Sequence, residues 1–256
     1  MVGAGSSFPC FVPRPEDLMF DSERGGAARE LSVEALVRSG ERLALEASFA
    51  KRRYEPELMD YRLGDCIKLK KKCGSDSDWG RETLAAAYAR RANRSHDFDL
   101  AARLVDEYRL RRFVPKPPTE ALVVHLRLGD VVRGSELPAS VLLVCSGPAV
   151  KNHTVVKSVY ELLADAKRAN TSRVILVGGS HTPLEPDDPS WFYALATHYA
   201  FQLAGYDASL RLETNPDDDF AFMSFANKFD VGCGGYSRII AMHVEQRGGT
   251  IVGRRF

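Results

Sequence analysis

The chain has 256 residues, of which 45% are hydrophobic and 27% are charged. These are the values of an ordinary globular protein that is long enough to bury a sizeable core. Its 35 Lys and Arg residues nearly balance its 34 Asp and Glu residues, which excludes a general basic field of the kind that holds nucleic acids. No apolar run approaches the ~18–20 residues of a membrane-spanning helix.

Residues 1–26 contain several Pro and Gly residues and are predicted to form an irregular arm. They lack the basic start and apolar centre of a signal peptide, which favours the cytoplasm if the chain is complete. Three N-x-S/T sequons, at Asn93, Asn152 and Asn170, are acceptors only in a secretory compartment and favour the ER or Golgi lumen. The sequence therefore does not decide between the cytoplasm and the ER or Golgi lumen.

Cysteine usage gives little support to a metal site. The five cysteines are widely spaced and form no CxxC pair, so no zinc cluster is predicted. Cys66 and Cys73 are close enough for a local disulfide, and two reduced thiols fit equally well. The basic run of residues 68–72 is either a solvated surface or a phosphate contact.

The first 118 residues are predicted to be mostly helical. Apolar residues recur at helical spacing in residues 27–51, 81–94 and 98–113. The Pro cluster of residues 115–118 cannot continue a helix and makes a natural linker. We therefore predict an N-terminal region of residues 1–118, a candidate acceptor side, followed by a second domain of residues 119–256.

Strands and helices alternate in the second domain. The predicted strands span residues 121–125, 141–145, 173–179, 210–214, 229–231 and 250–252. The predicted helices span residues 154–169, 191–203, 218–228 and 236–247. This alternation is typical of βαβ units and predicts an α/β fold with a doubly wound parallel sheet.

The first candidate site lies at the end of the strand at 121–125. His125 and Arg127 share one face of the strand because side chains alternate along it. Gly129 would let a ligand come close, and ligands of open α/β sheets bind at the carboxyl ends of strands. Arg127 either forms a structural pair with Asp130 or binds a ligand phosphate while Asp130 fixes the loop.

The second candidate site is the acidic helix start at Asp217, Asp218 and Asp219. Carboxylates there can simply cap the helix and offset its dipole. They can also accept hydrogen bonds from a base such as guanine, which presents two adjacent donors. No second acidic or His cluster has metal-ligand spacing, so no metal site is predicted.

The third candidate site is the glycine-rich turn of residues 231–238, between a strand and a helix. Such a turn is either a tight connection or an anion cradle made by N–H groups at the helix N-terminus. Ser237 would lie near the N-cap of the helix. No Walker A loop or nucleophile elbow occurs, and His181 follows a strand as a loop histidine.

Together, the three stretches resemble the donor domain of the fucosyltransferase-type GT-B glycosyltransferases, which include the protein O-fucosyltransferases and the α1,2- and α1,6-fucosyltransferases. The stretch His125-Leu-Arg-Leu-Gly-Asp130 is similar to the family's H-x-R-x-x-D motif. The stretch from Asp217 to Ser237 is similar to the later motif, in which an acidic residue opens a helix and an S-x-F-S turn begins the next. The resemblance covers residues 119–256.

The resemblance implies a role for each motif. Arg127 would hold the β-phosphate of GDP-fucose as the catalytic cation, and His125 would support the same pyrophosphate. Asp218 would hold the guanine, with Asp217 or Asp219 as rivals. The implied donor-binding residues are His125, Arg127, Gly129, Asp130, Asp218, Asp219, Gly235, Tyr236 and Ser237.

Two positions depart from the family pattern: Leu128 stands where many members have a second Arg, and Gly234 replaces the first Ser of the turn. The implied reaction is a metal-independent inverting transfer from a nucleotide sugar to a glycan or protein hydroxyl, without a cofactor. Candidate bases would be Glu57, Asp60 or Asp65. The alternatives are a non-catalytic nucleotide-sugar-binding or regulatory domain, and a structural α/β domain with a closed cleft.

Overall fold

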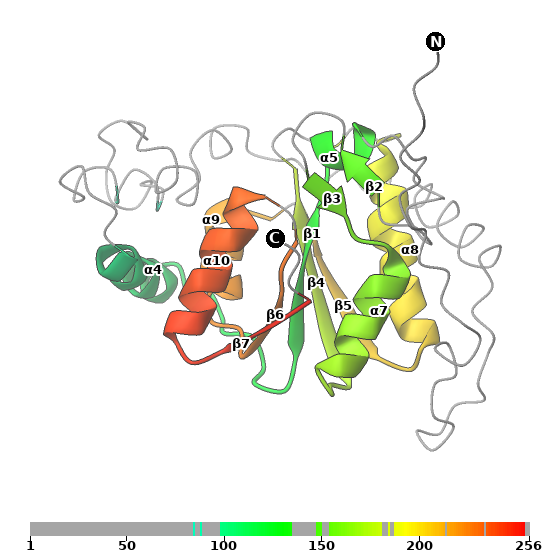
Figure 1. The fold of residues 1–256 in the computed structure, drawn as a ribbon. Coiled ribbons are helices and arrows are strands. Elements are labelled where there is room, and N and C mark those ends of the chain that lie inside the picture. The colour runs from blue at the N-terminus through cyan, green and yellow to red at the C-terminus, as the bar shows by residue number, and fades with distance from the viewer. Residues whose placement is uncertain are drawn as a thin grey trace, which may run out of the picture.

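The structure, a computed structural model, describes residues 84, 88, 98–134, 147–149, 154–180, 184, 187–212, 214–232 and 234–253. Figure 1 shows a central sheet with helices on both sides. The helices are α4 (Phe98–Arg111), α5 (Asp130–Arg133), α7 (Val159–Arg168), α8 (Pro189–Leu203), α9 (Pro216–Met223) and α10 (Gly235–Gln246). The strands are β1 (Leu122–Arg127), β2 (Gly147–Ala149), β3 (Thr154–Val156), β4 (Arg173–Gly179), β5 (Asp207–Leu212), β6 (Lys228–Asp230) and β7 (Thr250–Val252).

The main sheet has five strands in the order β5-β4-β1-β6-β7, and every pair is parallel. The chain runs from β1 outward through β4 to β5, and then returns to add β6 and β7 on the other side of β1. The strand order therefore reverses at β1, and in open α/β sheets the crevice beside such a reversal is where ligands bind. The predicted α/β fold with a parallel sheet is confirmed.

Side chains of β1 alternate between two hydrophobic layers. Val123 packs in the layer of α4, α9 and α10. Leu122, Val124 and Leu126 pack in the layer of α7 and α8. Figure 1 shows these two groups of helices on opposite sides of the sheet. By the same alternation, His125 and Arg127 belong to the face of α9 and α10.

The helix predicted over residues 154–169 was wrong at its start. Residues 154–156 form β3, which pairs antiparallel with β2, and α7 begins only at Val159. The reason is a capping box: Ser158 accepts a hydrogen bond from the N–H of Glu161, whose side chain accepts one from the N–H of Ser158. The predicted strand at 141–145 lies outside the described residues.

Helices α8 and α9 begin two residues before their predicted starts. Asp188 and Asn215 cap them, and a proline occupies the first helical position of each, where its missing N–H costs nothing. Helix α9 ends at Met223 instead of residue 228. Strand β5 spans Asp207–Leu212 instead of residues 210–214 because its register is set by pairing with β4.

Several predictions fall outside the described residues. These are the helix at 27–51, the basic run, all five cysteines, His181 and the candidate bases Glu57, Asp60 and Asp65. Leu84 and Tyr88, from the predicted helix at 81–94, are helical and pack in the layer of α4 and α9. No helix in the described part of the chain is long and apolar enough to cross a membrane.

A buried cation joins three segments beneath the carboxyl edge of the sheet. The ammonium group of Lys157 donates to Asp230 at the end of β6, to Asp165 on α7 (3.1 Å) and to the carbonyl of Gly253 after β7 (2.9 Å). All three of its N–H groups are used. Burial raises the pKa of Asp230 to about 8, against the opposing effect of Lys157. The cluster fixes the end of β6, from which the glycine-rich turn departs.

Candidate functional site

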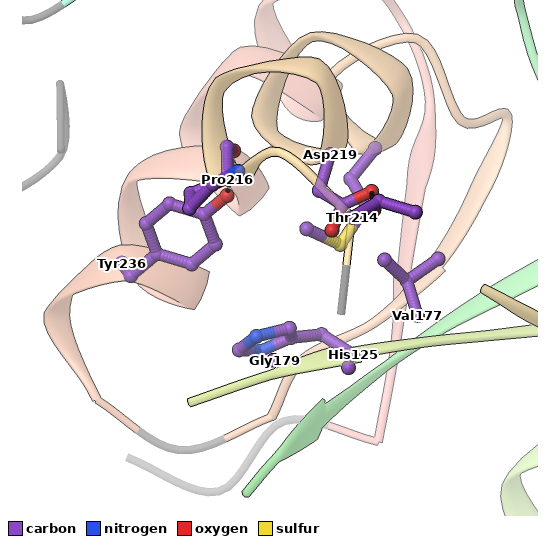
Figure 2. Close-up of a pocket in the computed structure, with 9 residues that line it drawn as sticks. His125, Val177, Gly179, Thr214, Pro216, Asp219 and Tyr236 are labelled. Carbon is purple, nitrogen blue, oxygen red and sulfur yellow. Dashed lines mark hydrogen bonds between the residues drawn. The ribbon is translucent and has the colours of Figure 1, made fainter. Parts of the chain in front are cut away.

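A pocket opens at the carboxyl edge of β1 and β4, beneath the first turns of α9 and α10 (Figure 2). The space within it, open solvent at its mouth included, is about 280 Å³. It is lined by His125, Val177, Gly178, Gly179, Thr214, Pro216, Asp219, Met223 and Tyr236. These residues come from strand ends and from the two segments that resemble family motifs.

The floor of the pocket is the end of β4. Val177 pairs in register with His125, and Gly179 pairs with Arg127. A β-carbon on Gly179 would meet nothing within 4 Å. The missing side chain therefore leaves room above the sheet, next to the two polar residues of β1.

His125 forms a wall of the pocket and is held in place by its neighbours. It is buried, and its ring lies 5.5 Å from the ring of Tyr236 at an interplanar angle of 50°. The Tyr236 hydroxyl donates to the carbonyl of Pro216 at 2.5 Å, so this ring joins α10 to the start of α9. Figure 2 shows Tyr236 above His125, with its hydroxyl end at Pro216.

Asp219 is the carboxylate that the structure brings into the pocket. Its Oδ1 accepts hydrogen bonds from the hydroxyl of Thr214 and from Nε of Arg211, the latter at 2.5 Å. Burial raises the pKa of Asp219, while Arg211 and Thr214 favour its ionised form and oppose that shift. The pocket thus offers a buried acceptor that is held by two donors on one oxygen.

Asp217 and Asp218 do not line the pocket. Asp217 accepts a hydrogen bond from the backbone N–H of Leu84 at 3.1 Å. Asp218 accepts one from the hydroxyl of Tyr108 at 2.9 Å and lies 3.8 Å from Nε of Arg112. These two carboxylates therefore join α9 to the segment around α4, and burial beside them raises the pKa of Tyr108.

Arg127 pairs with Asp130, as one of the two readings of this strand end predicts. One of its terminal nitrogens lies 3.1 and 3.4 Å from the two carboxylate oxygens. The Arg127 side chain is 11% exposed, and its Nε is buried without a hydrogen-bond partner among the described residues. The second terminal nitrogen makes no hydrogen bond with a described residue and suits an incoming anion.

Gly129 is required by the turn after β1. Its φ is +72°, and a β-carbon there would lie 1.7 Å from the hydroxyl oxygen of Ser180. Its N–H donates to the hydroxyl of Ser190 at the start of α8, at 2.8 Å. The turn between Arg127 and Asp130 is thus fixed by its neighbours and leaves no space for a side chain at its centre.

The third motif forms the N-terminus of α10. Gly234 is the N-cap residue, with φ +94° and no side-chain capping bond, and Gly235 begins the helix. Tyr236 lines the pocket, whereas the Ser237 hydroxyl is buried without a hydrogen-bond partner among the described residues. The first N–H groups of this 12-residue helix have no side-chain cap and suit an anion.

Comparison of the chain with family models, curated proteins and solved structures found no match. The chemistry of the site is therefore inferred from its own residues. No group of three or more His, Cys, Asp or Glu side chains that could hold a metal ion occurs among the residues that the structure describes.

Some residues of the site were not predicted from the sequence. Thr214, Pro216, Met223 and Val177 line the pocket, and Arg211 holds Asp219. The Asn-Pro start of α9 could have indicated that residues 214–216 lie at a helix start beside the strand ends. Arg211 gave no signal, because a single Arg in a short strand is typical of a solvated edge.

Proposed function

We propose that this chain is a glycosyltransferase of the fucosyltransferase type with a GT-B donor domain, and that its donor is GDP-fucose. One observation carries the proposal. His125, Asp219 and Tyr236, one residue from each of the three motifs, line a single pocket at the carboxyl edge of a parallel sheet. Ligands of open α/β folds bind at this edge.

The pocket would receive only an edge of the base, beside Asp219. The diphosphate would lie outside it, between the N-terminus of α10 and Arg127. Two observations support this placement: Gly234 gives α10 no side-chain cap, and only one terminal nitrogen of Arg127 is hydrogen-bonded to a described residue.

The proposed reaction is an inverting transfer that uses neither a cofactor nor a metal ion. The oxygen of an acceptor hydroxyl, on a glycan or a protein, forms a bond to C1 of the sugar as the bond from C1 to the diphosphate breaks. The hydroxyl proton passes to a general base, for which Glu57, Asp60 or Asp65 are the sequence candidates. The leaving electron pair stays on the diphosphate, where Arg127 and the α10 N–H groups would stabilise it. The three sequons favour the ER or Golgi lumen as its place of action.

A binding module without turnover is the second candidate. It is favoured because Asp130 already pairs with Arg127, the proposed catalytic cation. It is also favoured by Leu128, which is fully buried in an apolar layer at the position where many family members carry a second Arg. Release of GDP from GDP-fucose distinguishes the two candidates, because only the transferase turns the donor over.

A thermal-unfolding screen with GDP-, UDP- and ADP-sugars tests the proposal. A ligand at 100 times its Kd stabilises the folded state by about 2.7 kcal/mol. We expect stabilisation by GDP-sugars and GDP, and a smaller effect of the other nucleotides. Absence of stabilisation by any nucleotide sugar, supported by calorimetry, would overturn both the transferase and the binding module.

A further inference from the structure

Arg211 lies beside the proposed base site on a strand to which no role has been given. His125, Val177 and Arg211 occupy one register row across β1, β4 and β5. The Nε of Arg211 donates to Oδ1 of Asp219, and the Arg211 side chain is more exposed than that of Asp219, 24% against 7%. A half-buried cation thus lies beside the buried carboxylate that lines the pocket.

The guanidinium of Arg211 is held in a fixed orientation. Its central carbon lies 4.8 Å from the centre of the Phe222 ring, within the range of a favourable cation–π contact. Only Nε is used by Asp219, and no described residue accepts a hydrogen bond from the two terminal nitrogens. Thr214 shares Oδ1 of Asp219, so the described donors leave Oδ2 of that carboxylate available.

This pair has the hydrogen-bonding pattern that complements guanine. A carboxylate accepts from the N1–H and the 2-amino group, and a guanidinium donates to O6 and N7. Adenine carries an amino donor in place of O6, and uracil lacks the 2-amino group. We propose that Arg211 is a specificity-determining residue that, together with Asp219, selects a guanine base. This inference rests on the proposed nucleotide-sugar function and adds to it a residue that recognises the guanine base.

The proposal predicts a separable effect for each partner of the pair. 6-Thio-GDP keeps both donors of guanine and replaces O6 by sulfur, a weak acceptor, so it reports on Arg211. Inosine diphosphate keeps O6 and lacks the 2-amino group, so it reports on Asp219. We expect the wild-type protein to bind GDP about tenfold more tightly than 6-thio-GDP, as for loss of a charge-assisted hydrogen bond.

The test compares dissociation constants of the full chain and its variants for GDP, 6-thio-GDP and inosine diphosphate. In Arg211→Met, GDP and 6-thio-GDP should bind with equal dissociation constants. The ratio of the dissociation constants for GDP and inosine diphosphate should stay the same as in wild type. The matched control is Arg173→Met, because Arg173 pairs with Asp207 at the opposite end of β5 at 2.7 Å. This control should leave both ratios unchanged.

Other outcomes contradict the proposed function or the role of Arg211. A wild-type chain that binds no nucleotide overturns the proposed function and this inference with it. A wild-type chain that prefers GDP, with the same 6-thio-GDP ratio in Arg211→Met, overturns this inference alone. A change in both ratios would show that Arg211 only positions Asp219. If Arg211→Met fails to fold, Arg211→Lys keeps one donor for Asp219 and must still lose most of the 6-thio-GDP discrimination.

Discussion

Gly232 and His125 are in such close contact that a side chain on the glycine cannot be accommodated. A β-carbon on Gly232 would lie 2.4 Å from the His125 carbonyl oxygen and 2.6 Å from Nδ1 of its ring. The glycine-rich turn after β6 is therefore packed directly against the residue that forms a wall of the pocket. Glycine at position 232 is therefore needed for the turn to pack this closely against His125.

Gly232→Ala should therefore destabilise the fold and displace His125. Overpacking of this kind costs about 1–3 kcal/mol, which urea denaturation will measure. Gly179→Ala is the matched control, since its β-carbon would meet nothing within 4 Å. It should leave the stability nearly unchanged but weaken ligand binding by narrowing the pocket floor. Equal stability losses in the two variants would contradict the described packing.

Asp219, and not Asp218, should carry the ligand contact. Asp219→Asn should weaken GDP binding by about 1.5–3 kcal/mol, the value of a hydrogen bond to a charged group. Asp218→Asn should leave GDP binding unchanged, because Asp218 contacts Tyr108 and does not line the pocket. Isothermal titration calorimetry measures the GDP affinity of both variants. A larger loss of affinity in Asp218→Asn than in Asp219→Asn would assign the ligand contact to Asp218.

The choice among the three carboxylates shows where prediction from sequence stops. Consecutive residues of a helix point about 100° apart, so only one of Asp217, Asp218 and Asp219 can face the pocket. The sequence predicts a helix start there, but not its rotation about its axis. That rotation is set by α4 and by Tyr236, which contact α9 from distant parts of the chain.

Arg127→Ala should weaken GDP binding by about 1.5–3 kcal/mol through loss of a charge-assisted phosphate contact. The salt dependence of binding should fall as well, because one cation facing the ligand is removed. Arg111→Ala is the control, since Arg111 forms an exposed pair with Glu107 on α4. Unchanged GDP affinity in Arg127→Ala would leave Arg127 with only its structural pairing to Asp130.

His243 should make the fold sensitive to acid. Burial lowers the pKa of His243 to about 4, aided by Arg247 and opposed by Asp106. Between that value and the unfolded pKa of about 6.5, the unfolded chain binds the proton and the folded chain does not, so stability falls as pH falls. The loss between pH 7.5 and pH 5 should be about 2 kcal/mol.

His243→Leu should remove this part of the pH dependence. The imidazole is fully buried, packs edge-on against Phe220, and has no hydrogen-bond partner among the described residues. Its replacement should therefore maintain or raise stability at pH 7.5 and raise it clearly at pH 5. The assignment would be wrong if urea denaturation showed the same loss of stability between pH 7.5 and pH 5 in the variant as in wild type.

Lys157→Met should be among the most destabilising single substitutions in the described fold. It leaves the buried carboxylate of Asp230 without its cation, while Asp165 keeps its pair with Arg168. Breaking a buried pair in this way costs about 3–5 kcal/mol. Lys167→Met, on an exposed position of α7, should change stability by less than about 0.5 kcal/mol. Thermal unfolding measures both variants.

Patterns confined to one segment were predicted well, and those that depend on distant segments were not. The strand at 173–179 was predicted with its observed bounds, because its β-branched and apolar run is continuous. The link between Arg211 and Asp219 could not be foreseen, since it needs β5 and α9 to be placed side by side. The same holds for Lys157, whose partners Asp230 and Gly253 are 73 and 96 residues away.

The central place of β1 has a consequence for how the chain is made. Synthesis delivers β1 before every other strand of the sheet, yet its neighbours β4 and β6 come later in the chain. An apolar strand that is buried on both faces must therefore remain exposed on the ribosome until β4, and then β6, have emerged. Parallel pairing of this kind is slow and prone to aggregation. We expect folding in the cell to depend on chaperones that bind apolar segments during translation.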